Sequence, residues 1–546
     1  MKKKSTILVV VLTIIFGVGA ATVNNDKLFE ITKNIEIFTK IYRELNTYYV
    51  DDIDPSTLMK TGIDAMLSSL DPYTNYFSET QIENWRYMTE GKYEGIGARI
   101  NTISGKMTIT EVYENCPAQE SGLQAGDVIL TIDGKSTENL KNDDVSMFLK
   151  GVPGTKVTLK IQRPGTPDTK DYEITRSEIK MSNTPYAGMI NDEVGYISLV
   201  TFTQNAAKNV EHELRKLKLA HPGMKGVILD LRDNGGGLLN EAVDIVNIFE
   251  PANTEVVSTR GRVVEWDKSF KTRNSPVDAD IPLVVLVNRH SASASEIVSG
   301  AIQDLDRGVI IGQRSFGKGL VQQTKETGYN SKVKITISKY YIPSGRCIQA
   351  VSYKNGEPVD IPDSQRNKFK TRNGRTVLDG GGITPDIKID LHSNDAAIKS
   401  LIDSFLIFKF CVAYAENHPK VEDPKTYKFT DFDAFMKFIE TSAYPYVTET
   451  ESKLNELENT AKTEEYLADI KDEIIAARNK VQQEKKDILM KHKDDLQRYI
   501  TKTLVTRYFY QKGKIINGIQ NDEEVDAAVK LFQDPGRYRK ILSGKG

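Results

Sequence analysis

The chain has 546 residues, which is too long for a single hydrophobic core and predicts about three or four domains. Its 73 basic and 75 acidic side chains nearly balance, so composition and charge give no support for a nucleic-acid-binding protein. The three cysteines lie in separate regions and the six histidines show no metal-ligand spacing, so the sequence implies neither a disulfide framework nor a metal or organic cofactor.

The first segment, residues 1–23, has the pattern of a secretory signal. Three lysines precede an apolar run from Ile7 to about Gly19, and small residues follow it. The run is shorter than the roughly 20 residues of a membrane-spanning helix, but the pattern leaves two interpretations open. A cut after Ala20 or Ala21 would release the protein, whereas an uncut segment would tether it to the membrane. Both interpretations predict an exported protein of the periplasm or cell envelope.

Residues 24–90 are predicted to form an N-terminal helical domain, because apolar residues recur there at helical intervals on both sides of the sequence DDIDP. Short alternating strands with turn signals follow in residues 91–179 and predict a small β-rich module. In residues 180–390, apolar strands alternate with helical patterns, which favours a layered α/β core. Residues 391–546 are charged and helical in pattern, typical of a helical extension whose ends are suited to homodimer formation. The expected fold is therefore multidomain α+β.

The first motif of the core is NRHSASASEIVSG at 288–300, which follows the apolar strand PLVVLVN. Its central serine, Ser293, lies at a predicted strand-to-helix junction, where amide N–H groups and the helix dipole can stabilise an oxyanion. This placement suits a nucleophile in acyl transfer. The alternative is a purely structural serine, because Ser293 and Glu296 have the spacing of a helix capping box.

The second motif, RSFGKGLVQQ at 314–323, follows another apolar strand, GVIIGQ. Lys318 is a candidate base for the serine, because burial disfavours the ammonium form of a lysine. The alternative is an exposed, solubilising lysine. The segment also approaches the phosphate-loop pattern G-x-x-x-x-G-K, starting at Gly312. Gly319 replaces the serine or threonine of that pattern and a strand follows instead of a helix, so we disfavour a nucleotide site.

The third motif, LDLRDNGGGLL at 229–239, ends an apolar strand in a run of glycines. Glycines allow backbone amides to approach a ligand closely, which suits an oxyanion hole. The alternative is that these glycines serve only the geometry of a strand-to-helix turn.

In this order, and after a small β module, the motifs DLRDNGGG, SASASEI and FGKGLVQ resemble the C-terminal processing (tail-specific) peptidase family of serine peptidases. The resemblance extends over roughly residues 30–390 and includes the segment LDPYTNYFS at 70–78. It implies a Ser/Lys dyad in which Ser293 is the nucleophile and Lys318 is the base. It also implies that Gln322 helps to orient the lysine.

The same resemblance assigns the oxyanion hole to backbone N–H groups beside the serine and in the glycine run. These positions are Ala294 and Gly236 in this chain. One departure affects the second of them, because Gly235 stands where this family often has a proline. The loop is therefore expected to be more flexible, and a neighbour of Gly236 stays open as the donor.

Within residues 91–179, the segments GIGARI and AGDVILTIDGKS resemble a PDZ domain. Such a domain binds the free C-terminus of a protein by strand addition and holds its last side chain in an apolar pocket. The resemblance implies that the loop of Gly95, Ile96, Gly97 and Ala98 receives the terminal carboxylate. The alternative is a β module used only as a spacer.

The resemblance as a whole implies a serine endopeptidase that recognises the C-terminal tails of proteins or peptides through its PDZ domain and cleaves through an acyl-enzyme. Two other functions stay open. A Ser-His-Asp hydrolase would need His290, but a residue so close to Ser293 in one turn seldom faces it. A non-enzymatic envelope scaffold would use the PDZ domain to tether partner tails without turnover.

Overall fold

The computed structural model describes residues 25–81, 86, 89–354, 357–360, 362–389, 396–442 and 447–544. The predicted signal or anchor, residues 1–23, lies outside these ranges. None of the helices in the described ranges combines the length and the apolar character needed to cross a membrane. The chain divides into two compact units, Met1–Tyr76 with Asn355–Glu357, and Phe77–Lys354 with Pro358–Gly546.

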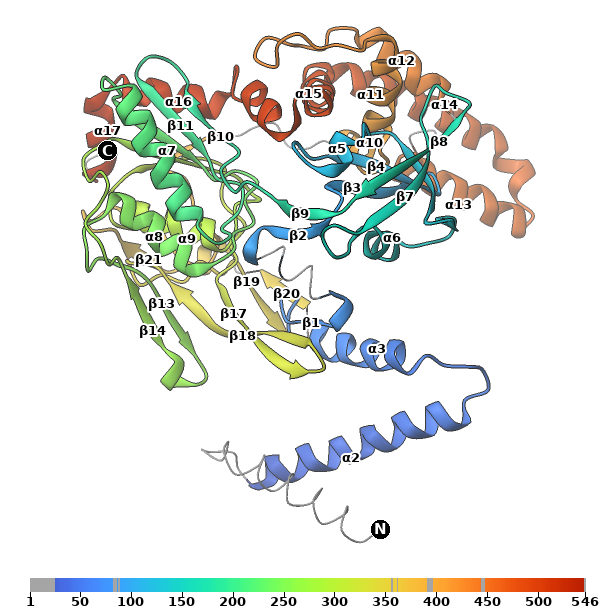
Figure 1. The fold of residues 1–546 in the computed structure, drawn as a ribbon, viewed down its shortest axis with the longest axis horizontal. Coiled ribbons are helices and arrows are strands. Elements are labelled where there is room, and N and C mark those ends of the chain that lie inside the picture. Colours follow the sequence, from blue (N-terminus) through green and yellow to red (C-terminus); the bar gives the residue numbers. More distant parts are fainter. Residues whose placement is uncertain are drawn as a thin grey trace. The chain divides into compact units, whose positions relative to one another are not determined.

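The smaller unit contains two helices, α2 (Asn25–Tyr48) and α3 (Pro55–Ser68), as the apolar spacing predicts (Figure 1). Asp54 starts α3, because its side chain accepts a hydrogen bond from the Thr57 amide at 2.8 Å. Pro55 follows at the first helical position, where its missing N–H costs no helical hydrogen bond. The DDIDP break in the sequence therefore contains a helix start.

An antiparallel sheet forms the PDZ-like module near the start of the larger unit (Figure 1). Its strands, in pairing order, are β3 (Ala98–Ile103), β4 (Lys106–Val112), β5 (Val128–Ile132), β7 (Lys156–Gln162) and β8 (Thr169–Thr175). The short elements are α5 (Pro117–Glu120) and β6 (Lys135–Ser136). Helix α6 (Asn142–Leu149) contributes Val145 and Leu149 to the core of the module. Strands β2 (Lys92–Gly95) and β9 (Ser177–Lys180) pair with each other, so the chain enters and leaves the module at one place.

A second sheet of the larger unit forms the α/β core. Its strands, in pairing order, are β10 (Tyr186–Met189), β11 (Val194–Ser198), β12 (Gly226–Asp230), β15 (Leu283–Val287), β16 (Val309–Gly312) and β23 (Ile387–Lys388). Strand β10 is antiparallel to β11, and the other neighbouring pairs are parallel. Strands β11, β12 and β15 are buried along their whole length, as expected for a parallel sheet covered on both faces.

Helices from two distant parts of the chain cover the two faces of this sheet. One face carries α7 (Ala206–Ala220), α8 (Leu239–Phe249) and α9 (Ala294–Asp304), and the other carries α16 (Glu523–Phe532) and α17 (Pro535–Leu542). Alternate side chains of β12 point to opposite faces, so Val227 and Leu229 pack with the first set and Ile228 packs with the second. The last two helices are therefore built into the core.

A third sheet lies beside the core. Its strands, in pairing order, are β17 (Leu320–Gly328), β18 (Ser331–Tyr341), β13 (Glu255–Gly261) and β14 (Lys268–Lys271). A short hairpin follows, made of β21 (Lys368–Lys370) and β22 (Thr376–Leu378).

The other C-terminal helices form a cluster of their own. They are α10 (Ala396–Asp403), α11 (Leu406–Asn417), α12 (Phe432–Thr441), α13 (Glu449–Thr463), α14 (Leu467–Lys491) and α15 (Lys493–Gly518). Helix α15 also contacts the PDZ-like module, because Tyr510 accepts a hydrogen bond from Gln119 Nε2 at 2.7 Å and Arg507 donates to the carbonyl of Ala125. The helical region thus touches both the module and the core.

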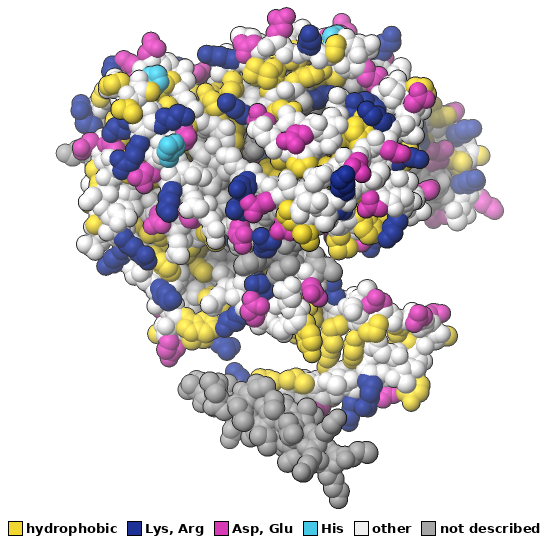
Figure 2. Space-filling view, in the orientation of Figure 1, with side chains coloured by type: hydrophobic (Ala, Val, Ile, Leu, Met, Phe, Trp, Pro, Cys, Tyr) yellow, Lys and Arg dark blue, Asp and Glu magenta, His cyan; other side chains and the backbone are white. Residues whose placement is uncertain are grey.

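The predicted multidomain α+β class is confirmed by this architecture (Figure 1). Figure 2 shows basic and acidic side chains interspersed over the face in view. This distribution agrees with the near balance of charge in the sequence.

Candidate active site

Ser293 lies between the buried strand β15 and helix α9, as the motif SASASEI predicts. It directly precedes the first helical residue, Ala294, and its backbone has φ 57° and ψ −112°. A positive φ is uncommon for a residue with a Cβ atom and stores strain, which is a frequent property of functional sites. The serine is therefore held in a strained turn at the start of a helix.

Glu296 connects the turn of Ser293 with the loop of Lys318. Its side chain is fully buried, and its Oε2 atom accepts hydrogen bonds from the backbone N–H groups of Ser293 and Lys318, each at 2.8 Å. Its Oε1 atom accepts from Ser315 Oγ and from the Gly317 N–H, each at 2.6 Å. The bond from Ser293 belongs to the capping box that the sequence predicts, whereas the other three reach across to the next loop.

The burial of Glu296 has an electrostatic consequence. Removal from water raises the pKa of this carboxyl to about 7, although the four hydrogen bonds donated to it favour the ionised form and oppose the shift. The residue that aligns the two motifs therefore changes its charge near neutral pH.

Tyr340, a buried residue of β18, also contacts both motifs. Its hydroxyl lies within hydrogen-bond distance of the Ser293 carbonyl, at 3.1 Å, and of the Lys318 carbonyl. One hydroxyl proton is shared between these two acceptors. Its backbone N–H donates to the Gly319 carbonyl at 3.0 Å. Ser293 and Lys318 are therefore joined twice, through their amides by Glu296 and through their carbonyls by Tyr340.

Gly236 approaches the serine closely. A Cβ atom at this position would lie 2.6 Å from the Ala292 carbonyl oxygen and 2.8 Å from both the Ala294 nitrogen and the Ser293 Cβ, and φ is +96°. Only glycine fits both this space and this conformation. The Gly236 N–H donates to Asn234 Oδ1 at 2.9 Å. The glycine run is thus packed directly against the turn of Ser293.

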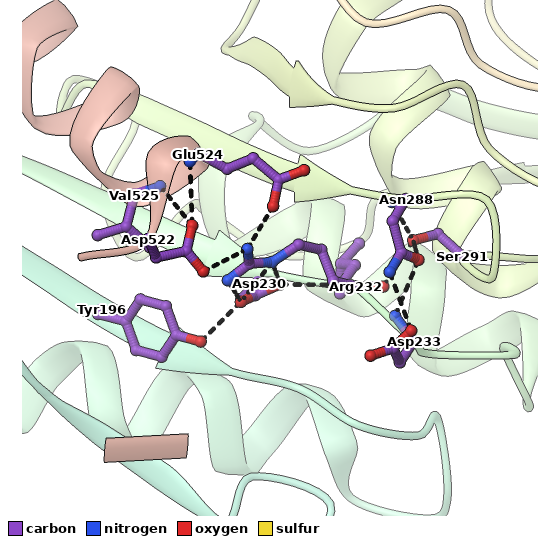
Figure 3. Close-up of polar contacts among 10 residues, drawn as sticks. Tyr196, Asp230, Arg232, Asp233, Asn288, Ser291, Asp522, Glu524 and Val525 are labelled. Atoms are coloured by element: carbon purple, nitrogen blue, oxygen red, sulfur yellow. Dashed lines mark hydrogen bonds and ion pairs between the residues drawn. The ribbon is translucent and has the colours of Figure 1, made fainter. Parts of the chain in front are cut away.

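Asn234 and Asp233 hold the glycine run in this place. The buried Asn234 accepts hydrogen bonds at its backbone carbonyl from the Ala292 N–H, at 3.0 Å, and from Ser295 Oγ, at 2.8 Å. Asp233 exchanges two hydrogen bonds with Asn288, from the Asp233 N–H at 3.0 Å and from Asn288 Nδ2 at 2.9 Å (Figure 3). Both residues therefore tie the loop to the segment that carries the serine.

Arg232, in the same loop, is bound by three carboxylates (Figure 3). Its Nη2 atom lies 2.6 Å from Asp230 Oδ2, which also accepts a hydrogen bond from the Tyr196 hydroxyl at 2.7 Å. Its Nη1 atom lies 2.7 Å from Asp522 Oδ2 and also contacts Glu524 Oε2. Asp522 and Glu524 lie at the start of α16, so this loop is joined to the end of the chain.

A cavity of about 1430 Å³ lies beside these loops. The residues predicted for the dyad, for its orientation and for the oxyanion hole all line it: Ser293, Lys318, Gln322, Gly236 and Ala294. Gln322 lies on β17 and donates from Nε2 to Thr336 Oγ1 of β18 at 3.2 Å. Exposed His290, which the alternative hydrolase would need, also lines the cavity, from the turn just before Ser293.

The predicted carboxylate loop of the PDZ-like module lies between β2 and β3, with Gly95 at the end of β2 and Ala98 at the start of β3. Ile96 is buried at 2% exposure. Gly97 has φ +83°, and a Cβ atom there would lie 2.3 Å from Cys116 Cβ, so this turn requires glycine.

The sequence motifs did not point to Asn234, Arg232 or Tyr340. They did not point to Asp522 and Glu524 at the start of α16 either, and they indicated Glu296 only as a capping residue. One signal for Glu296 was present, because the helix ASEIVSGAIQD is otherwise made largely of small and apolar residues. A carboxylate in such a helix is a candidate for burial, and a buried carboxylate needs hydrogen-bond donors. The sequence does not show which donors these are.

Comparisons with known proteins show which family this chain belongs to. Peptidase family S41 matches residues 193–359, a PDZ domain matches residues 108–163, and the C-terminal helical domain of probable PDZ-proteases matches residues 397–532. The chain is 33% identical over 349 residues to the carboxy-terminal-processing protease of Bartonella bacilliformis, covering 64% of this chain and 79% of that protein. It is 37% identical over 310 residues to the carboxyl-terminal-processing protease of Synechocystis, covering 55% of this chain and 71% of that protein.

Among solved structures, the photosystem II D1 C-terminal processing protease is similar, with 25% identity, a TM-score of 0.37 and coverage of 67% of this chain and 94% of that one. The PDZ domain and the helical C-terminal domain predicted from the sequence are both confirmed by their family matches. The chain therefore belongs to the carboxy-terminal-processing proteases of peptidase family S41, and it is a serine-type peptidase.

Proposed function

We propose that this peptidase is an endopeptidase with a Ser/Lys dyad, in which Ser293 is the nucleophile and Lys318 is the general base. One observation carries the proposal: the backbone amides of these two residues donate to the same oxygen atom of the buried Glu296. A shared acceptor fixes the two loops relative to each other, and both residues line one cavity. Fixed mutual geometry is what a nucleophile and its base require.

In the proposed reaction, neutral Lys318 accepts the proton of the Ser293 hydroxyl while Oγ attacks the carbonyl carbon of the scissile peptide bond. The tetrahedral intermediate then expels the amine half of the substrate, which takes up that proton, and leaves an acyl-enzyme. Water, deprotonated by the lysine, hydrolyses the ester and restores the serine. Gln322, four positions after the lysine and at the same cavity, orients it.

The backbone amides of Ala294 and Gly236 form the oxyanion hole in this proposal. Ala294 is the first helical residue, and the amide N–H groups of a first helical turn have no partner within the helix. Gly236 packs against it, because a Cβ atom added to this glycine would lie 2.8 Å from the Ala294 nitrogen. Because the Gly236 N–H donates to Asn234, this hydrogen bond has to open or be shared when the oxyanion forms.

The PDZ domain selects the substrate. An extended tail with a free, apolar C-terminus adds to β3 beside α6, and its carboxylate meets the amides of the loop at 95–98. Arg99 of β3 lines the cavity of Ser293, so a tail bound along β3 lies near the dyad. The relatives from Bartonella and Synechocystis, named as carboxy-terminal-processing proteases, support this substrate class. The pattern of residues 1–23 supports export to the periplasm or cell envelope, either released or tethered.

The decisive experiment measures cleavage of a long unfolded polypeptide that ends in apolar residues, with its C-terminus either free or amidated. Wild-type protein should cut the free form faster, and Ser293→Ala and Lys318→Ala should cut neither. Two matched controls should cut like the wild type, Ser299→Ala on the same helix and Lys325→Ala on β17. Activity of Ser293→Ala at the wild-type level would refute the dyad. Binding of tails without turnover by the wild type would favour the scaffold.

A lysine base also determines how the rate depends on pH. Protonation at low pH converts the base to an ammonium group, which cannot accept the serine proton, so kcat/KM should fall as the pH is lowered. A rate that stays constant from roughly pH 5 to 9 would contradict this mechanism.

A further inference from the structure

Arg232 links the loop of the glycine run to the C-terminal helical domain (Figure 3). Its side chain is 15% exposed and meets Asp522 and Glu524, which lie 290 and 292 positions further along the chain. A contact between segments so distant in sequence exists only when α16 is docked on the core sheet. The apolar residues of α16, including Val525 and Leu531, provide that docking.

Asp522 divides its carboxylate between two interactions. Its Oδ1 atom accepts hydrogen bonds from the N–H groups of Glu524 and Val525, each at 3.0 Å, and thereby caps α16. Its Oδ2 atom binds Arg232 at 2.7 Å. Because the helix holds one oxygen, the other oxygen presents a fixed anchor to the arginine.

Glu524 is nearly completely buried, with 1% of its side chain exposed. Its Oε2 atom contacts Arg232, whereas its Oε1 atom is buried without a hydrogen-bond partner among the described residues. Burial raises the pKa of Glu524 to about 7, and the nearby Arg232 opposes this shift. A buried carboxylate with one unsatisfied oxygen contributes little to stability, because the cost of desolvation offsets the attraction. Stability alone therefore does not explain why Glu524 is buried against Arg232.

The loop after Arg232 leads directly to the turn of Ser293. Asp233 and Asn234 hydrogen-bond to that turn, and Gly236 packs against it. Only three residues separate Arg232 from Gly236, so the arginine and the glycine run belong to one short loop. Arg232 is thus an anchor at the start of the loop whose glycine run packs against Ser293.

We propose that Asp522 and Glu524 are positioning residues of this peptidase: they hold Arg232, and through it they keep Gly236 beside Ser293. The C-terminal helical domain is then part of the active-site architecture. This inference rests on the proposed roles of Ser293 and of the glycine run. It gives the C-terminal helical domain a role that its sequence alone does not indicate.

The test uses the full chain with the double substitution Asp522→Asn and Glu524→Gln. Asparagine caps a helix as well as aspartate does, and glutamine has the shape of glutamate, so α16 should still form and dock. The control is Asp526→Asn, which removes one negative charge from the exposed face of the same helix. Five quantities are measured: kcat and KM for a tail peptide, the Kd of that peptide, the rate of Ser293 labelling by a fluorophosphonate, and the midpoint of thermal unfolding.

The double variant should lose about 10-fold to 100-fold in kcat and in the labelling rate, because a small misplacement of a catalytic group is enough for such a loss. KM and Kd should stay within about twofold of the wild type, since the PDZ domain is untouched. In a protein that already carries Arg232→Gln, the double substitution should lower kcat by less than about twofold more. The guanidinium group that Asp522 and Glu524 bind is already absent there.

A wild-type kcat in the folded double variant would overturn the positioning role. A loss that merely follows the fraction of unfolded protein would overturn it as well, because the pair would then serve stability alone. Ser293→Ala separates this inference from the proposed function. If Ser293→Ala is inactive and the double variant is fully active, the dyad stands and only the positioning role fails.

Discussion

The backbone amides of Ser293 and Lys318 donate to one carboxylate oxygen, Oε2 of Glu296, at the same distance of 2.8 Å. The relative position of the two residues is thus set by their backbone groups. Replacing either side chain by alanine leaves these hydrogen bonds in place, so Ser293→Ala and Lys318→Ala should fold normally. Loss of activity in these variants would then report on chemistry rather than on structure.

Glu296→Gln should lower kcat strongly while the protein still folds. Four donors surround the carboxylate, but a glutamine side chain has only one oxygen to accept them, and its NH₂ group is itself a donor. At least one loop therefore loses its anchor, and we expect a loss of about 10-fold to 100-fold in kcat and about 1–3 kcal/mol in the free energy of unfolding. The matched control is Glu326→Gln, an exposed glutamate of β17, and should behave as wild type. Unchanged kcat in Glu296→Gln would contradict the aligning role.

Glu296 should also make stability depend on pH. Its pKa is about 7 in the folded protein, above the usual value of 4.5, so the folded state holds this proton more tightly than the unfolded state does. The stabilisation is therefore fully present below the usual value and is lost as the pH rises through about 7. Denaturant titrations from roughly pH 4 to 8 should show wild type losing stability relative to Glu296→Gln over this window. A constant difference between the two proteins would contradict the raised pKa.

Tyr340→Phe should remove the second connection between the motifs and leave the core packed. The phenyl ring fills the same space, but the hydrogen bonds to the Ser293 and Lys318 carbonyls are lost. We expect kcat to fall by about 10-fold with little change in KM. Tyr341→Phe on the same strand is the control, because the ring of Tyr341 stacks with Arg260 instead. Equal kcat values for the two variants would show that this connection is dispensable.

Gly236→Ala and Gly235→Ala should differ sharply although the two positions are adjacent. At Gly236 an added methyl group would collide with the turn of Ser293, and φ is +96°. At Gly235 an added Cβ atom meets nothing within 4 Å. Steady-state assays should show that kcat falls by more than about 100-fold in Gly236→Ala and by less than about fivefold in Gly235→Ala. A similar loss of kcat in both variants would show that the loop tolerates a side chain at neither position. It would contradict a specific role of Gly236.

Local sequence patterns were sufficient to predict the class of fold and the three motifs at strand ends. Buried strands such as β12 and β15 are continuous apolar runs, and turns that need glycine contain glycine. Apart from the capping-box bond with Ser293, the partners of Glu296 could not be predicted in this way, and neither could the bonds of Arg232 to Asp522 and Glu524, because they depend on which distant segments meet in space. The apolar positions of α16 predict an amphipathic helix but do not identify the surface that it covers. The signal or anchor at residues 1–23 stays a prediction.

Because α16 and α17 follow the core strands in the chain, the core sheet is covered late in synthesis. Strands β11 to β16 precede residues 523–542 in the chain, so one face of the sheet stays uncovered until α16 and α17 have been made. A chain that ends before α16 therefore has an unfinished core and lacks Asp522 and Glu524, two of the three carboxylates that bind Arg232. We therefore expect a chain without α16 and α17 to lack peptidase activity, because both the covered sheet and the proposed positioning of Arg232 depend on them.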